Sequence, residues 1–215
     1  MTNQTTILST KTLSPIQKQE LVKANIEVIE AEFIKTENAS FEIKNLNKNL
    51  IFTSQNAVLS ILQHPKIEEL KQKTVFCVGL KTKELLNENG FTVEAYTGYA
   101  EDLAEIITLV YSDESYTFFS GNLRRDTLPE MLTENGITFN EIKVYDTTLT
   151  PHKISDKVDG ILFFSPSAVT SYLKKNTLAN EKLFCIGNTT ADALRSVLSE
   201  TKIKNIKTAY QPSVE

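Results

Sequence analysis

The chain has 215 residues, of which 40% are hydrophobic and 23% charged, a composition typical of a globular protein with a buried core. Its formal net charge is −4, which gives no broad basic face, so we expect no nucleic-acid partner. No apolar run approaches the roughly 20 residues that a membrane-spanning helix needs. The N-terminal segment MTNQTTILSTK lacks the basic start and apolar core of a secretory signal. These features predict a cytoplasmic protein without a membrane segment.

The cysteines and histidines argue against a disulfide and against a metal site. Cys77 and Cys185 lie in the apolar runs TVFCVG and KLFCIG, so both are expected to be small buried residues of strands, without a disulfide. His64 and His152 are far apart in the sequence, and no Cys/His cluster surrounds either of them. We therefore predict no metal, and the absence of a cofactor motif leads us to expect no cofactor.

Short apolar runs bounded by turn residues predict the strands. The segments between them carry apolar residues three and four positions apart, as in Val58, Ile61 and Leu62, which indicates helices. Gly90 and Gly136, each preceded by Asn, are expected to end helices. The regular alternation predicts an α/β fold with parallel sheets. In chain order, the predicted strands include ILS (7–9), LIFTS (50–54), VFCVG (75–79), TFFSG (117–121), ILFFS (161–165) and LFCIG (183–187).

The chain contains an internal duplication. A shift of 111 positions places residues 50–62 on residues 161–173, so that Ser54 falls on Ser165. The same shift places Ile7-Leu8-Ser9 on Phe118-Phe119-Ser120. After a deletion of three residues, 75–79 matches 183–187. Several matches in the same order at nearly one offset indicate a duplicated unit, and hence two similar lobes.

Small polar residues follow the predicted strands directly, where parallel sheets commonly bind ligands. A helix N-terminus at this edge offers free N–H groups to carboxylates or phosphates. An alternative is that these residues are only helix caps or first-turn residues. Neither a phosphate-binding P-loop nor the three-glycine dinucleotide pattern is present, so nucleotide binding has weak support. The residues concerned are Ser54, Gly79, Thr82, Ser120-Gly121, Ser165, Gly187 and Thr190.

Two further residues at these junctions have both a functional and a structural interpretation. Arg124, in Gly-Asn-Leu-Arg-Arg-Asp, could bind a carboxylate with two parallel hydrogen bonds, or it could face water in the first helical turn. Tyr145 follows a predicted strand, where a tyrosine usually serves packing. Its counterpart in the first half is Ile34, so the repeat itself does not require the hydroxyl, and this asymmetry favours a special role.

Together these segments resemble the uroporphyrinogen-III synthase family. The resemblance implies two flavodoxin-like lobes that are joined by a two-stranded β-linker and have the active site in the cleft between them. One lobe would comprise residues 1–34 plus 147–215 and the other 35–146, with linker strands at about 26–37 and 137–148. The segments that carry it are IFTSQNAV (51–58), FCVGLKT (76–82), FFSGNLRRDTLPEML (118–132), VYDTT (144–148), FFSPSAVTSYL (163–173) and FCIGNTTADAL (184–194).

The family resemblance implies a lyase that closes hydroxymethylbilane, an open chain of four pyrroles with eight carboxylates, into uroporphyrinogen III. The terminal hydroxyl leaves as water, and the last pyrrole is inverted through a spiro intermediate. Tyr145 matches the tyrosine that helps the hydroxyl to leave. The protein is expected to act as a monomer. The candidate substrate-binding residues are Ser54, Thr82, Gly121, Asn122, Arg124, Ser165, Ser167, Thr189 and Thr190.

Two departures from the family pattern, and two rival functions, stay open at this point. Lys83 stands where the second half has Ala191, so this junction could bind differently. The second half also stops at residues 213–215, where the first half continues into EDLAEIITLV (101–110), which could expose a helix-packing face. The main rival function is a non-catalytic two-lobe protein that binds a small anion; a flavodoxin-like electron carrier has less support.

Overall fold

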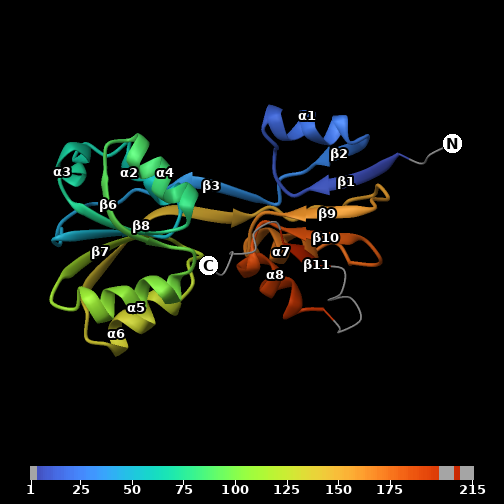
Figure 1. The fold of residues 1–215 in the computed structure, drawn as a ribbon. Helices are drawn as coiled ribbons and strands as arrows, with labels where there is room; N and C mark the ends of the chain where they lie inside the picture. Colours follow the sequence, from blue (N-terminus) through green and yellow to red (C-terminus); the bar gives the residue numbers. More distant parts are fainter. Residues whose placement is uncertain (1–3, 199–205, 209–215) are drawn as a thin grey trace. The chain divides into compact units, whose positions relative to one another are not determined.

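The chain forms two compact units in a computed structural model that describes residues 4–198 and 206–208 (Figure 1). Unit 1 consists of Met1–Lys35 and Thr148–Glu215, and unit 2 consists of Thr36–Thr147. The chain therefore passes between the units at residues 35–36 and again at 147–148. These positions lie one residue after the lobe boundaries expected from the family resemblance.

Unit 2 contains a six-stranded sheet with the strand order β3-β8-β7-β4-β5-β6. β3 pairs with β8 in the opposite direction, because Thr36 lies opposite Thr147 while Ala39 lies opposite Val144. The other strands pair in parallel, as the alternation of apolar strands and helices predicted. The strands are β3 (Ile34–Asn38), β4 (Asn49–Phe52), β5 (Thr74–Val78), β6 (Thr92–Thr97), β7 (Ser115–Gly121) and β8 (Thr138–Leu149).

Helices cover both faces of this sheet because its strands are apolar on both sides. Neighbouring residues of β7 illustrate the arrangement: Phe118 joins the core cluster of Leu103 and Ile107, whereas Phe119 joins the cluster of Val58 and Leu86 on the opposite face. α5 and α6 thus cover one face, and α2, α3 and α4 the other (Figure 1). The helices are α2 (Gln55–Ile61), α3 (Ile67–Lys71), α4 (Leu80–Glu88), α5 (Ala100–Val110) and α6 (Thr127–Glu134).

Unit 1 contains a parallel sheet with the order β11-β10-β9-β1-β2. Leu8, Phe163 and Leu183 of three adjacent strands form a core with Val169 and Leu194 of the helices that follow β9 and β10. The elements are β1 (Thr5–Ser9), α1 (Pro15–Lys23), β2 (Ile26–Glu30), β9 (Gly160–Phe163), α7 (Pro166–Leu173), β10 (Lys182–Cys185), α8 (Asn188–Arg195) and β11 (Ile206–Thr208).

The two sheets place the duplicated strands in the same spatial order. β11, β10, β9, β1 and β2 of unit 1 correspond to β6, β5, β4, β7 and β8 of unit 2. Numbered along its own part of the chain, unit 1 has the flavodoxin order 2-1-3-4-5. The five parallel strands of unit 2, without the antiparallel β3, read 3-2-1-4-5, because the chain enters the same arrangement at a different strand. The parallel α/β fold class predicted from the sequence is confirmed.

The expected linker segment 26–37 consists of two strands with different partners. Its first part is β2, which pairs in parallel with β1 inside the sheet of unit 1. Only β3 pairs with β8, the second expected linker segment. The same antiparallel register continues past the unit boundary, where the Thr150 amide donates to the Phe33 carbonyl at 2.9 Å. Both passages of the chain therefore lie within one two-stranded ribbon.

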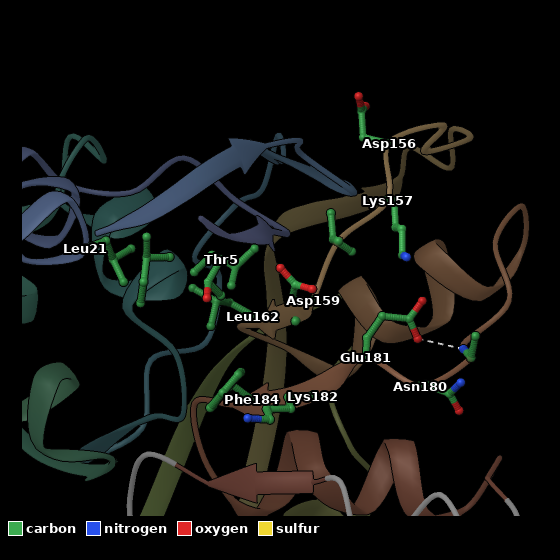
Figure 2. Close-up of a pocket in the computed structure, with 15 residues that line it drawn as sticks. Thr5, Leu21, Asp156, Lys157, Asp159, Leu162, Asn180, Glu181, Lys182 and Phe184 are labelled. Carbon is green, nitrogen blue, oxygen red and sulfur yellow. Dashed lines mark hydrogen bonds between the residues drawn. The ribbon is translucent and has the colours of Figure 1, made fainter. Parts of the chain in front are cut away.

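A hollow of about 1010 Å³ lies at the amino ends of β1, β9 and β10 in unit 1 (Figure 2). Ile7, Leu162 and Phe184 contribute apolar surface to it. The duplication aligns these residues with Phe118, Ile51 and Phe76. In unit 2 these three residues lie on the face of the sheet that α5 covers. The chain end, for which the sequence suggested an exposed packing face, lies at residues 209–215, outside the described residues.

Candidate active site

The carboxyl ends of the parallel strands bring the predicted junctions of each unit to one edge of its sheet. In unit 2, Ser54 follows β4, Gly79 follows β5 and Gly121 ends β7. β4 and β7 are neighbours from which the chain continues in opposite directions along the sheet, and such switch points are where open α/β sheets bind ligands. In unit 1, Ser165 and Gly187 follow β9 and β10 in the same way. The hollow of Figure 2 lies at the opposite edge, and none of the described candidate residues lines it.

Two of the predicted serines are helix caps. The Ser54 hydroxyl accepts the Asn56 amide at 3.1 Å, and the Ser165 hydroxyl accepts the Ala168 amide at 3.1 Å. Ser167 lies beside Ser165, with 3.0 Å between the two hydroxyl oxygens. A hydroxyl that accepts a cap hydrogen bond keeps its own O–H for another acceptor. The capping role therefore leaves the Ser54 donor available to a carboxylate.

The predicted threonines lie in the first turns of the next helices. Thr82 of α4 and Thr190 of α8 are both buried, and their amides bond back to the carbonyls of Gly79 and Gly187. Thr189, one residue earlier in α8, is half-buried. These positions show first-turn packing, and their participation in substrate binding stays a prediction.

Lys83, the departure noted in the sequence, lies over an aromatic ring. Its Nζ is 3.8 Å from the centroid of Tyr96 in β6, a distance typical of a cation–π contact. This contact within unit 2 holds the positive charge of Lys83 near the end of β5.

Arg124 is partly exposed and precedes α6, and its guanidinium is paired with carboxylates. Its Nε donates to Glu141 Oε1 at 2.7 Å and its Nη2 to Oε2 at 3.0 Å, which is the two-point geometry that arginine uses for carboxylates. Nη1 also contacts Asp126. The Ser120 hydroxyl donates to the same Glu141 carboxylate at 2.5 Å. These four residues, with Lys143 and the Gly121–Asn122 turn, line a hollow of about 370 Å³.

Charge pairing shifts the titration of both partners. Burial alone would raise the pKa of Glu141, but the hydrogen bonds from Arg124 and Ser120 outweigh burial and hold this pKa below its ordinary value. The hydrogen bond with Glu141 is the main reason that the pKa of Arg124 is raised. Both groups are therefore charged at neutral pH.

Tyr145 lies on β8 directly opposite Gly121, the last residue of β7. Its ring packs at the margin of the core cluster that contains Val58 and Val144. The Asn122 amide donates to the Tyr145 carbonyl at 3.3 Å, and the Asn122 side chain binds the main chain of Thr147. The three residues Gly121, Asn122 and Tyr145 thus form one structural group.

Unit 2 therefore separates its candidates into two sets. Ser54, Thr82 and Tyr145 lie with α2, α4 and the core cluster on one face of the sheet. Neighbouring residues of a strand point to opposite faces, and Ile142 of β8 packs on the first face. Glu141 therefore points to the face that α6 covers, and Arg124 binds it there. The sequence reasoning missed Glu141, and it named Ser120 only as part of the Ser120–Gly121 junction. β8 mixes polar and apolar residues and carries a second acid, Asp146, so no local feature distinguishes Glu141.

Two further features of the described residues bear on function. No helix in the described part of the chain is long and apolar enough to cross a membrane. Within the same residues, no group of three or more His, Cys, Asp or Glu side chains is placed to hold a metal ion.

Residues 17–215 match the family model described as uroporphyrinogen-III synthase HemD. A uroporphyrinogen-III synthase of Chlorobaculum parvum is 27% identical over a 183-residue alignment that covers 74% of this chain and 74% of that one. The crystal structure of uroporphyrinogen-III synthetase from Helicobacter pylori 26695 superposes with a TM-score of 0.68 at 23% identity, covering 98% of this chain and 94% of that one. A mutant uroporphyrinogen III synthase from the extremely thermophilic bacterium Thermus thermophilus gives a TM-score of 0.66 at 16% identity, over 89% and 88% of the two chains.

The two solved structures support the fold, and the family model, which matches nearly the whole chain, shows the family. This chain belongs to the uroporphyrinogen-III synthase family, the lyases that form uroporphyrinogen III.

Proposed function

We propose that this chain closes hydroxymethylbilane into uroporphyrinogen III, with loss of the terminal hydroxyl as water and inversion of the last pyrrole through a spiro intermediate. The observation that carries the proposal is the edge that each sheet presents, where helix N-termini and hydroxyl side chains follow neighbouring parallel strands. Such an edge suits a ligand that carries many carboxylates.

The substrate carboxylates have suitable donors in each unit. α4 begins at this edge of the unit 2 sheet, and α7 and α8 begin at the corresponding edge of the unit 1 sheet. The first N–H groups of a helix have no partner inside the helix. The Ser54 hydroxyl adds a donor that its capping bond leaves free, and the Ser165–Ser167 pair, in which one hydroxyl donates to the other, adds one further O–H. Thr82, Ser167, Thr189 and Thr190 complete the proposed binding residues of the two edges.

Arg124 would enter this set only by exchanging one carboxylate for another. Its guanidinium already binds Glu141 through two hydrogen bonds, so a substrate carboxylate has to replace Glu141. Such an exchange keeps the arginine paired but takes the ion-pair partner away from Glu141, which then keeps the hydrogen bond from Ser120, so part of the substrate's binding energy offsets the loss of this pair.

Tyr145 is the proposed chemical residue. When the C–O bond of the terminal hydroxymethyl group breaks, the electron pair leaves with the oxygen, and a hydrogen bond or proton from the phenol helps that oxygen to leave as water. The pyrrole nitrogen supplies the electrons that form the azafulvene and releases its proton, so that the elements of water are lost. The substituted carbon of the last pyrrole attacks this azafulvene to form the spiro intermediate. The bond from that carbon to its original methylene bridge then breaks, and the unsubstituted carbon of the same pyrrole bonds to the bridge and loses a proton, which leaves this pyrrole inverted.

The larger part of the catalysis is expected to come from the conformation of the bound substrate. The open chain can cyclise unaided without inversion. The enzyme therefore has to favour attack by the substituted carbon of the last pyrrole over attack by the unsubstituted carbon at the open end of the chain. Restriction of a flexible substrate to one reactive geometry can contribute several kcal/mol, on the order of 7 or more in favourable cases. This role requires neither a nucleophile–base pair nor a cofactor, and we propose that it is carried out by a monomer in the cytoplasm.

The deciding experiment is incubation of the purified protein with hydroxymethylbilane, followed by oxidation and chromatographic separation of the uroporphyrin isomers. Product of type III in excess over the enzyme-free control is the expected result. Type I product alone, in the same amount as the control, would show that the chain does not catalyse the inversion.

A further inference from the structure

The pairing of β7 with β8 contains an irregularity at Tyr145. Ser120 pairs with Lys143, but the next residue, Gly121, pairs with Tyr145, so that Val144 is an extra residue in β8. Successive side chains of a regular strand point to opposite faces, yet Val144 and Tyr145 both pack on the core cluster beneath α2 and α4. The bulge therefore turns the Tyr145 ring to the face where Ser54 and α4 lie, and bulges near functional sites commonly redirect a side chain in this way.

Gly121 provides the space that the ring occupies. A β carbon at position 121 would overlap Cζ and Cε2 of Tyr145 and would lie 2.7 Å from its hydroxyl oxygen. Only a residue without a side chain allows the phenol to lie against the main chain at the end of β7. The requirement is steric, because the ring would collide with any side chain at this position.

Asn122 fixes the strand on the other side of the tyrosine. Its main-chain amide donates to the Tyr145 carbonyl at 3.3 Å. Its side chain accepts the Thr147 amide at 2.7 Å and donates to the Thr147 carbonyl at 3.1 Å. The carboxamide thus replaces a main-chain partner and extends the ladder by one residue beyond the end of β7. The Asn122 side chain is consequently committed to the protein main chain.

The duplication provides an internal comparison. The shift of 111 residues places Thr10 at the position of Gly121, Lys11 at that of Asn122 and Ile34 at that of Tyr145. β1 and β2 of unit 1 pair from Thr5 to Ser9 without a register shift. The glycine, the asparagine and the bulge accompany the tyrosine in unit 2, so the repeat alone does not account for them.

We propose that Gly121 and Asn122 are positioning residues for Tyr145 and do not bind the substrate themselves. Gly121 provides the space for the phenol ring, and the Asn122 carboxamide holds the strand that carries it. This inference rests on the proposed function, because it assigns to both residues the task of placing the group that assists departure of the hydroxyl. It replaces the direct substrate contact that the family resemblance implied for these two positions.

A double-mutant cycle tests the proposal with the full-length chain and hydroxymethylbilane. kcat, KM and the fraction of type III product are measured for wild type, Asn122→Ala, Tyr145→Phe and the double variant. If Asn122 acts through Tyr145, its replacement lowers kcat severalfold, leaves KM within about a factor of two, and has no further effect when Tyr145→Phe is present, because residues that act as one unit are not additive. Asn135→Ala is the matched control, since the Asn135 carboxamide also binds a main-chain carbonyl, that of Met131, at the end of α6.

A measurement without substrate tests the placement of the ring directly. The protein is labelled with 3-fluorotyrosine, and the ¹⁹F resonance that disappears in Tyr145→Phe is assigned to Tyr145. Gly121→Ala and Asn122→Ala are expected to shift or broaden this resonance, while Asn135→Ala leaves it unchanged. Thermal unfolding of each variant shows whether the fold is retained.

The outcomes are distinct for the two hypotheses. A wild-type protein that yields no type III product contradicts the proposed function. The positioning role would be overturned, while the function stands, if Asn122→Ala lowered kcat equally in the wild-type and Tyr145→Phe backgrounds. It would also be overturned if Asn122→Ala changed KM alone. An unchanged Tyr145 resonance in Gly121→Ala would also overturn it, as would a Tyr145→Phe variant that turns over at the wild-type rate.

Discussion

Arg124 binds Glu141 through two parallel hydrogen bonds of 2.7 and 3.0 Å, and Ser120 donates to the same carboxylate. The protein thus places a carboxylate of its own on the arginine that the sequence suggested for a substrate carboxylate. Each side chain of the pair is 27% exposed, so solvent screens the interaction only in part. The pair joins the end of β7 to β8, and it has consequences both for stability and for substrate binding.

Replacement of Glu141 by Gln is expected to destabilise the protein in a pH-dependent manner. Because the folded-state pKa of Glu141 is lowered, its charge contributes stability above the unfolded-state pKa, near 4.5, and the contribution is lost as the pH falls through the folded-state value. We expect a loss of about 1 kcal/mol at pH 7, below the roughly 1.5–3 kcal/mol of charged hydrogen bonds, because the pair is partly exposed to solvent. Denaturant unfolding of both proteins from pH 7 to pH 3 measures this difference.

The control for this experiment is Glu42→Gln, because the ion pair of Glu42 with Lys44 is about three-quarters exposed. That variant is expected to unfold like wild type throughout the pH range. A Glu141→Gln difference that stayed constant from pH 7 to pH 3 would show that the loss comes from packing and not from the charge.

The same ion pair predicts opposite effects of two substitutions on substrate binding. Arg124→Gln removes the proposed carboxylate ligand and is expected to raise KM about tenfold, since a charge-assisted bidentate contact contributes roughly 1.5–3 kcal/mol. Glu141→Gln removes the competing charge and is expected to lower KM by a small factor. Initial rates of type III formation at varied hydroxymethylbilane concentration measure both values. An unchanged KM in both variants would leave Arg124 with a structural role only.

Tyr145→Phe is expected to lower kcat by about tenfold and to leave KM and the unfolding temperature nearly unchanged. The expected loss is smaller than the roughly 100-fold or more of a full general acid, because restriction of the substrate conformation persists without the hydroxyl. Single-turnover formation of type III product measures the effect. Tyr111→Phe is the control, since the Tyr111 hydroxyl binds Glu94, away from the strand-end edge. A wild-type rate for Tyr145→Phe would remove the phenol from the mechanism.

The duplication made the strand positions and the edge of each sheet predictable. Ser54 and Ser165 were placed at helix starts because apolar runs and their turn residues are local features, and the structure confirms that both cap helices. The contact between Gly121 and Tyr145 could not be predicted in this way. It depends on a one-residue register shift between two strands, which sequence periodicity does not encode. The Arg124–Glu141 pair likewise depends on which residues of β8 face α6.

The two cysteines are expected to be inert towards thiol reagents in the folded protein. Burial raises the pKa of Cys77 to about 12 and that of Cys185 to about 11, so almost no thiolate is present at pH 8. Both thiols are free and lie in central strands. Labelling with a chromogenic disulfide reagent should therefore be slow for the native protein and should reach two thiols per chain in denaturant. Rapid labelling without denaturant would show that one of these strands opens readily.

The capping serines permit a separation of stability from substrate binding. Ser54→Ala and Ser165→Ala are each expected to cost about 1 kcal/mol, because each loses the acceptor for a helix N–H group. Gly at a cap position costs only a few tenths of a kcal/mol, so Ser54→Gly and Ser165→Gly should retain most of the stability while they remove the hydroxyl donor without adding another. If the hydroxyls bind carboxylates, both substitutions raise KM, whereas a role confined to capping leaves the KM of the Gly variants unchanged. Denaturant unfolding and steady-state kinetics on the same four proteins distinguish the two roles, because only substrate binding requires the O–H group.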